Sequence, residues 1–408
     1  MIPFNRFARH SLHVFLLYCV AGFSVHASDL TDDTGQAVRE FENYLAENVL
    51  PYVPGAAVVV VAQGQVRLLQ AYGMRETGGH EPVDPDTVFR LASVSKTFAS
   101  AAAGLLVNDN QVSWDTPIVS RVKQITFKDP ELGSKITLQN VLSQTTGLVP
   151  HAFTNLIEDN VRYQSILGRL NEVDFVCPPG TCYTYQNVAY SLSGDFIESV
   201  SGKAYEEFVA ERLFQPLHMD DASFGLDAFK ASDNKATPHV RRRQQWNPVA
   251  VKPTYYRVAP AAGVNASISD MGEWLQAQLG QRQDILPEQV LDSLHSRAVS
   301  TTRRQAHYKR QDGISNTAYG LGWRIFDFAE HKNFIHHSGW VQGTLADMVF
   351  NRELQLGMVF LTNAESPDTT DLIFKFLDAF LNNEQLIETQ ELSMNSTGEI
   401  QSVSEAVK

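Results

Sequence analysis

The chain is poor in cysteine, with three in 408 residues, at positions 19, 177 and 182. So few cysteines exclude a small disulfide-stapled scaffold and a cysteine-rich zinc protein. Cys177 and Cys182 enclose a Pro-Pro-Gly turn, and they remain as an even pair if Cys19 is removed with the segment described below. We therefore expect a disulfide between them. Two free thiols or a metal site are the alternatives, but no histidine flanks the pair.

Positive charge is also scarce. Lysine and arginine total 33 against 46 aspartates and glutamates, which gives a formal charge of −13. An acidic chain of this kind is a poor nucleic-acid binder, so we expect no nucleic-acid partner. The basic run Arg241-Arg242-Arg243 is too short to change this balance. It indicates a solvated loop or, alternatively, a cleft rim that meets an anionic substrate.

Long apolar runs are missing beyond residue 27, so the sequence predicts no stable membrane span there. Before it, Arg6 and Arg9 precede an apolar run over residues 12–20, and Val25-His26-Ala27 offers small residues at a cleavage site. This pattern predicts a secretory signal peptide over residues 1–27. A single membrane anchor is the alternative, but the run is short for a span. A lipoprotein anchored through Cys19 is a weaker one.

The order of predicted elements indicates an α+β fold. A helix is expected over 36–48 and a hairpin over 56–62 and 65–72, whose turn is Gln63-Gly64. Further strands are expected over 321–327, 334–337, 343–351 and 355–362, with a closing helix over 368–381. Strands at both chain ends imply one antiparallel sheet with a mostly helical insertion. We expect one domain over 28–385, with sheet parts at about 34–90 and 315–382, a helical part at about 91–314, and a disordered polar tail over 386–408.

The first candidate site is Ser93-Val94-Ser95-Lys96, which precedes a run of small and apolar residues typical of a buried helix. The spacing puts Ser93 and Lys96 on one helix face. A serine hydroxyl needs a base to become a nucleophile, and a buried lysine with a lowered pKa can serve. A helix-capping serine with a solvated lysine is the alternative.

Two further patches carry polar groups. Tyr185-Gln186-Asn187 lies where a loop enters a predicted helix, so the tyrosine can relay protons and the asparagine amide can hold a carbonyl group. His336-His337-Ser338-Gly339-Trp340 ends a predicted strand, and Gly339 permits close approach of a substrate. A histidine pair is more often structural. A metal site built from His331, His336 and His337 is disfavoured because no carboxylate completes it, and we expect neither metal nor cofactor.

These patches, in this order, resemble the serine β-lactamase and penicillin-binding-protein superfamily. The resemblance is to its class C branch, with a His-x-Gly motif in place of Lys-Thr-Gly. It covers roughly residues 34 to 382. The segments that carry it are residues 93–98, 142–148, 185–187, 216–219, 263–274, 319–323, 336–339 and 361–363.

The resemblance implies that Ser93 is acylated and that Lys96 and Tyr185 transfer its proton, leaving open which of the two is the base. Asn187, His337, Ser338, Gly339 and Trp340 would bind the substrate, with the oxyanion hole formed by the backbone N–H groups of Ser93 and Trp340. The family's lysine is replaced by His337, which we expect to titrate near pH 6.5.

The expected protein is a secreted or periplasmic bacterial serine hydrolase. Its leading activity is amide hydrolysis of the β-lactamase or penicillin-binding type, on a small-molecule or peptidoglycan-like amide or ester. A D-aminopeptidase, a D-alanyl peptidase or a carboxylesterase of the same fold is the alternative, since the same catalytic residues serve all of them. A slowly acylating penicillin-binding sensor is a third possibility.

Overall fold

The computed structural model describes residues 33–381 apart from 307, 309 and 311. The expected signal peptide (1–27) and polar tail (386–408) lie outside these residues. Within them, eight strands form an antiparallel sheet in the order β2-β1-β13-β12-β11-β10-β9-β8. The strands are β1 Gly55–Ala62, β2 Gln65–Gly73, β8 Val299–Ser300, β9 Ile314–Tyr319, β10 Arg324–Phe328, β11 His331–Val341, β12 Thr344–Asn351 and β13 Leu356–Thr362.

The two ends of the chain meet near one edge of the sheet, where β1 and β13 are neighbours. Strand β1 is rich in valine and buried along its whole length, as expected for a strand covered on both faces. It pairs with β2 through the predicted hairpin and with β13, where Val58 lies opposite Phe360. Gln63 and Gly64 have positive φ angles of 52° and 72°, which a tight two-residue hairpin turn requires.

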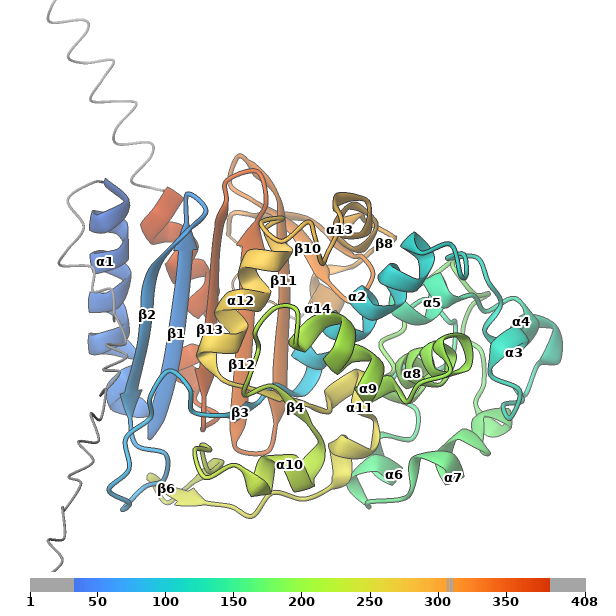
Figure 1. Ribbon diagram of the computed structural model, residues 1–408, viewed down its shortest axis with the longest axis horizontal. Coiled ribbons are helices and arrows are strands. Elements are labelled where there is room, and N and C mark those ends of the chain that lie inside the picture. Colours follow the sequence, from blue (N-terminus) through green and yellow to red (C-terminus); the bar gives the residue numbers. More distant parts are fainter. Residues whose placement is uncertain (1–32, 307, 309, 311, 382–408) are drawn as a thin grey trace, which may run out of the picture.

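Helices cover both faces of this sheet (Figure 1). The helix α1 (Asp33–Asn48) and the closing helix over 372–381 pack on one face, and their apolar side chains form a core with Phe326, Phe334 and Phe360. The other face packs against α2 (Ser95–Asn108) and α12 (Ile268–Gln278) in a larger core that extends into the helical part. Residues of β11 therefore point alternately into two different environments.

The helical part lies between β3 and β8 in the sequence and projects from one side of the sheet (Figure 1). It includes the long helix α8 (Asn187–Ser201), which packs against α2. Its other helices are α3 Ile118–Arg121, α4 Pro130–Ser134, α5 Leu138–Leu142, α6 Thr154–Glu158, α7 Tyr163–Leu167, α9 Tyr205–Val209, α10 Gly225–Ala231, α11 Ala259–Ala262, α13 Glu288–His295 and α14 Arg303–Ala306.

The α+β prediction is confirmed, and most predicted sheet strands match the observed ones to within a few residues. The predicted strand over 321–327 begins later, at Arg324, because 320–323 form a turn. Strands β8 and β9 were not predicted, because β8 has two residues and β9 is largely polar. Two small sheets were also missed, formed by β3 Phe89–Arg90, β4 Ser223–Phe224 and β7 Val264–Ala266, and by β5 His239–Arg242 and β6 Gln245–Pro248.

Two local predictions concern loops of the helical part. Cys177 and Cys182 form the expected disulfide, with their Cα atoms 6.4 Å apart. The basic run Arg241-Arg242-Arg243 lies at the exposed tip of the β5–β6 hairpin, where Arg241 is stacked over the ring of Trp246. This placement agrees with the solvated loop that the sequence indicated.

Candidate active site

Ser93 lies in the short 3₁₀ turn η3 (Ala92–Val94) that leads directly into α2. The sequence placed it in the first turn of an α-helix, and the structure places it just before that turn. The preceding residue, Ala92, has a φ of +47°, a left-handed conformation that costs energy for a residue with a Cβ. This sharp bend leaves the Ser93 side chain half-exposed while both its neighbours are buried.

Lys96 is completely buried on α2, and its Nζ contacts three oxygens. It donates to Asn187 Oδ1 at 2.8 Å and to the carbonyl of Ala261 at 2.9 Å, and it lies within hydrogen-bonding distance of Ser93 Oγ, at 3.1 Å. Burial, and then the positive charge of Arg324, lower the pKa of Lys96 well below its usual value. This shift favours the neutral amine, whose lone pair can accept the Ser93 proton while its two N–H groups bond to Asn187 and Ala261. The Ala261 contact could not be foreseen, because a backbone carbonyl has no sequence signature.

Tyr185 reaches the same hydroxyl from the loop before α8, and its OH donates to Ser93 Oγ at 3.1 Å. The loop is held on both sides: Gln144 Oε1 accepts the N–H of Gln186 at 2.8 Å, and the N–H of His151 donates to the Tyr185 carbonyl at 2.9 Å. Burial raises the pKa of Tyr185, although the bond to Ser93 and the charge of Arg324 act in the opposite direction. Its phenol is therefore protonated at neutral pH.

Asn187 is the first residue of α8 and is nearly buried. Gln186 caps this helix, since its Oε1 accepts the N–H groups of Val188 and Ala189 at 2.8 and 3.1 Å. The cap fixes the start of α8, so the Asn187 side chain points at Lys96 Nζ. In the predicted Tyr-x-Asn segment, Tyr185 therefore contacts Ser93 and Asn187 contacts Lys96.

Gly339 on β11 packs against η3. The pairing of β11 with β10 ends at Arg324–His336, and beyond that point β11 meets the turn that holds Ser93. A Cβ at Gly339 would lie 2.0 Å from the carbonyl oxygen of Leu91 and 2.9 Å from the nitrogen of Ser93. Only glycine permits this approach. Because Gly339 packs so closely, the backbone of the next residue, Trp340, lies near the turn that holds Ser93. Trp340 itself is 60% exposed. This geometry suits an oxyanion hole.

His337 is buried and uncharged, which corrects the expectation that it titrates near pH 6.5. Its Nδ1 lies 2.8 Å from the Ser338 carbonyl and its Nε2 lies 3.2 Å from the Tyr319 OH. Because a carbonyl only accepts, Nδ1 carries the proton and Nε2 accepts from the tyrosine. Burial, followed by the charges of Arg324 and Lys96, lowers the pKa of His337 well below its usual value. The histidine is therefore a neutral hydrogen-bonding group.

His336 points to the opposite face of β11. Its Nε2 lies 2.8 Å from Asp347 Oδ1 and its Nδ1 lies 3.1 Å from the Tyr308 OH. These residues, with Ser338 and Trp340, line a hollow of about 420 Å³ beside the strand that flanks Ser93. The two histidines therefore do not converge. No cluster of metal-ligating side chains was found among the described residues.

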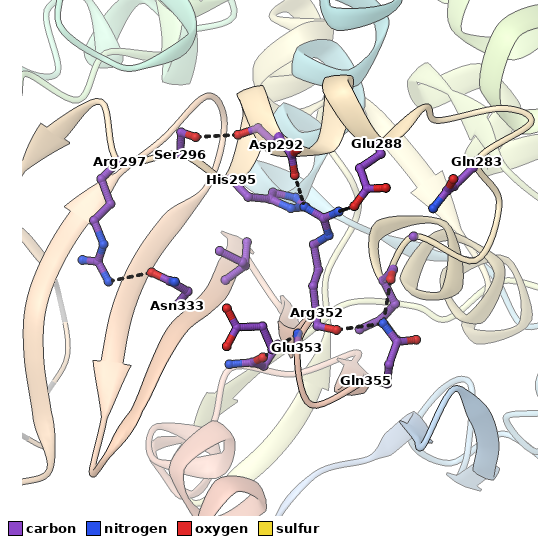
Figure 2. Close-up of a pocket in the computed structure, with 14 residues that line it drawn as sticks. Gln283, Glu288, Asp292, His295, Ser296, Arg297, Asn333, Arg352, Glu353 and Gln355 are labelled. Carbon is purple, nitrogen blue, oxygen red and sulfur yellow. Dashed lines mark hydrogen bonds and ion pairs between the residues drawn. The ribbon is translucent and has the colours of Figure 1, made fainter.

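A larger hollow of about 720 Å³ contains none of the residues around Ser93 (Figure 2). Arg352, from the β12–β13 turn, donates to Asp292 at 2.7 Å and to Glu288 at 3.4 Å, both on α13. Next to it, His295 Nε2 lies 3.0 Å from Gln278 Oε1. Burial, and then Arg352, lower the pKa of His295 well below its usual value. Arg352 is thus paired with two carboxylates of this hollow, and no serine that lines it among the described residues contacts a base as Ser93 does.

The fold and the arrangement around Ser93 define a serine-centred site in a β-lactamase-like architecture. A family model described as Beta-lactamase matches residues 45–378, and the chain belongs to this family. The structure of an octameric penicillin-binding protein homologue from Pyrococcus abyssi is similar, with a TM-score of 0.73 and 21% identity. The match covers 85% of this chain and 77% of that one, and it supports the fold.

Curated relatives are distant. The chain is 24% identical over 364 residues to unguisins hydrolase ungD' of Aspergillus campestris, and 25% identical over 354 residues to Protein flp of Staphylococcus aureus. The alignments cover 85% and 84% of this chain. The chain spans 66% of the length of each relative, just under two thirds. Among the residues that the structure describes, no helix is long and apolar enough to cross a membrane.

Proposed function

We propose that the protein is a serine hydrolase that works through an acyl-enzyme on Ser93. The observation that carries this proposal is the convergence of Lys96 Nζ and the Tyr185 OH on Ser93 Oγ, each at 3.1 Å. A nucleophile with two proton-transfer groups in direct contact is the arrangement that acyl transfer needs. Membership in the Beta-lactamase family supports the same reaction class.

In the proposed reaction, Ser93 Oγ attacks the carbonyl carbon of an amide or ester while its proton passes to the base. The negative charge that forms on the carbonyl oxygen is stabilised by the backbone N–H groups of Ser93 and Trp340. The proton then reaches the leaving amine or alcohol as its bond to the carbonyl carbon breaks. Water later attacks the Ser93 ester, releases the acid and restores the hydroxyl.

The electrostatics favour Lys96 over Tyr185 as the proton acceptor. The pKa of the lysine is lowered by burial, so the neutral amine is available, whereas burial raises the pKa of the tyrosine. Tyr185 then serves as a donor that passes a proton toward the leaving group. Asn187 holds the Lys96 amine on one side while Ser93 lies on the other.

The leading substrate class is an amide of the β-lactam or penicillin-binding type, as in the class C branch that the motifs resemble. A D-amino-acid peptidase or a small-ester hydrolase is the second candidate, and the neutral state of His337 favours it. Without a cation at this position, recognition of a β-lactam carboxylate is weaker. His337, Ser338, Gly339 and Trp340 are proposed to line the substrate path on either version.

Export of the protein to the periplasm or the medium is also part of the proposal. It is supported by the signal-like pattern over residues 1–27 and by the disulfide between Cys177 and Cys182, which persists in oxidising compartments. The catalytic domain is proposed to span residues 28–385, with the tail over 386–408 outside it.

The test is to incubate the protein with a chromogenic cephalosporin and to follow colour release and intact mass together. Sustained turnover that is lost in Ser93→Ala is the expected result. Ser100→Ala is the matched control, because this serine lies on the same helix and its hydroxyl donates to the carbonyl of Thr97 instead of contacting Ser93. An unchanged rate in Ser93→Ala would overturn the proposal.

The same experiment separates the substrate classes. A stable adduct on Ser93 without turnover indicates a penicillin-binding protein or sensor. If the cephalosporin does not react, D-alanyl amides and short esters are offered next, and their hydrolysis through Ser93 supports the second candidate. Failure of all these substrates and of a serine-reactive fluorophosphonate to modify Ser93 would reject the serine hydrolase itself.

A further inference from the structure

Arg324 is a nearly buried arginine beside the proposed catalytic groups. It begins β10, its residue is 9% exposed, and its Nη1 donates to the carbonyl of Gln305 at 3.1 Å. Its guanidinium carbon lies 5.8 Å from the centre of the Tyr185 ring and 5.9 Å from that of Tyr319, within the range of cation–π contact. Arg324 thus adjoins the tyrosine that reaches Ser93 and the one that holds His337.

No carboxylate forms an ion pair with Arg324 among residues 33–381, with 307, 309 and 311 left aside. The carboxylate of Asp347, which belongs to the same region, is engaged by His336 at 2.8 Å. Burying an arginine without a counter-ion is costly, because the guanidinium stays charged and loses its water. Burial lowers the pKa of Arg324, but the surrounding tyrosines, Tyr183 first, raise it above its usual value, so the guanidinium stays charged. Its Nη1 also donates to the carbonyls of Gln305 and Ala306.

Lys96 and Arg324 approach the same aromatic ring. Lys96 Nζ lies 4.9 Å from the centre of the Tyr185 ring, and Arg324 lies 5.8 Å from it. His337 is neutral for the reasons given above, and burial lowers the pKa of Lys96 well below its usual value. Arg324 therefore remains as the permanent positive charge next to Tyr185, on the strand adjacent to the one where the family's lysine is replaced by histidine.

We propose that Arg324 is a positioning residue whose permanent charge, buried next to Tyr185 without a carboxylate partner, tunes the Ser93 site by opposing positive charge on Lys96 and stabilising negative charge that develops at Ser93 and Tyr185. The inference rests on the proposed serine hydrolase function. It assigns a role to a residue outside the three motifs. The charge acts through space on Lys96 and Tyr185, and Arg324 itself need not touch the substrate.

The sign of the effect is the same for both candidate bases. A nearby positive charge disfavours protonated lysine and favours ionised tyrosine, so its removal raises the pKa of each group. The acidic limb of the pH–rate profile should then move to higher pH, whichever group is the base. The titratable groups that surround this charge are Lys96 on α2, Tyr183 and Tyr185 on the loop before α8, Tyr308, Tyr319 on β9, His336 and His337 on β11 and Asp347 on β12.

The experiment measures the rate at which Ser93 is acylated, across the pH range in which the protein stays folded. The probe is a fluorophosphonate or a fluorescent penicillin, whichever labels Ser93 in the wild type. In Arg324→Gln we expect the acidic limb to shift upward by about one pH unit. In Arg324→Lys, which keeps the charge, the limb should stay near its wild-type position. Arg352→Gln, which removes a carboxylate-paired arginine away from Ser93, should not move it.

Folding of each variant is checked by circular dichroism and by its urea midpoint. Arg324→Met, which keeps an apolar stem and removes the charge, replaces Arg324→Gln if the latter does not fold. An unmoved limb in a folded neutral variant would overturn the inference, and so would an equal shift in Arg324→Lys. Absence of labelling in the wild type by either probe would instead reject the proposed function, so the two failures are distinguishable.

Discussion

Arg324 and Arg352 define two charged regions that differ in their partners. Arg352 is bound by the carboxylates of Glu288 and Asp292 on α13 (Figure 2), and its side chain is 22% exposed. Arg324 is more deeply buried, and tyrosine rings surround it instead of carboxylates. Each arginine also lies near a histidine whose pKa is lowered, His295 in one region and His337 in the other.

An ion pair and a buried charge without a carboxylate partner affect the protein differently: the first joins two elements, and the second acts on neighbouring titratable groups. Arg352 forms ion pairs with two carboxylates, which join α13 to the β12–β13 turn. The field of Arg324 is not cancelled and reaches Lys96 and Tyr185. An unpaired buried charge lowers stability, and such a cost is common at functional sites.

The largest effect is expected from removing a proton-transfer group in the Arg324 region. Tyr185→Phe deletes the hydroxyl that contacts Ser93 Oγ, so kcat should fall by about 10²- to 10⁴-fold. Steady-state kinetics on the best substrate of the wild type measure this. Tyr205→Phe is the control, because the Tyr205 hydroxyl is buried without a hydrogen-bond partner among the described residues. Equal activity of the two variants would contradict the assignment.

The next effect concerns the approach of β11 to Ser93. Gly339→Ala places a Cβ against Leu91 and Ser93, so we expect kcat to fall by about 10²- to 10³-fold, the size seen when an oxyanion donor is lost. Gly272→Ala is the control, since its Cβ would meet Val59 at an ordinary 3.5 Å. The same kinetic assay, with a thermal melt for each variant, separates displacement of the donor from unfolding. Full activity in Gly339→Ala would argue against this oxyanion hole.

The two neutral histidines predict how stability depends on pH. Below about pH 6.5 the unfolded chain binds protons at His295 and His337 that the folded chain does not yet bind. Stability is therefore lost as the pH falls, by about 1.4 kcal/mol per pH unit for each histidine. Urea unfolding at several pH values should show a shallower acid dependence in His295→Gln and in His337→Gln. A slope equal to that of the wild type in both variants would refute the neutral state of these rings.

The smallest effect is expected on the free energy of unfolding when each of the two arginines is replaced by methionine. Arg352→Met leaves two carboxylates together and should lower the free energy of unfolding by up to about 1 kcal/mol, since both partners are largely exposed. Arg324→Met removes an unpaired buried charge and should leave stability unchanged or raise it by about 1 kcal/mol. Urea unfolding at neutral pH measures both. A larger loss of unfolding free energy in Arg324→Met than in Arg352→Met would contradict the view that the buried Arg324 charge destabilises the fold.

Much of the fold could be predicted because its elements have strong local patterns. The valine run of β1, the Gln63-Gly64 turn and the small-residue helix after Ser93 each carry their own signal. The short or polar strands β8 and β9 do not, since their stability comes from pairing within the sheet rather than from propensity. The same limit explains why the small sheets were missed.

The candidate site divides in a similar way. Ser93, Lys96, Tyr185 and Asn187 were predicted from spacing and motif order, and the structure brings their side chains together. Tyr319 and Arg324 were not assigned roles, although Tyr319 begins the segment 319–323 that was noted for its resemblance and Arg324 directly follows it. Their contacts depend on how β9, β10 and the loop before α8 approach each other, which no local pattern reveals.

Residue types and spacing alone pointed to the groups that can do chemistry here: a hydroxyl and an amine three residues apart, a tyrosine ahead of a predicted helix, and a glycine that permits close approach of a substrate. The charge states of these groups depend on the tertiary structure. Burial lowered the pKa of Lys96 and of His337, and no carboxylate forms an ion pair with Arg324 within the described residues. The physical reason is that a pKa depends on desolvation and on neighbouring charges, which chain folding alone brings into place.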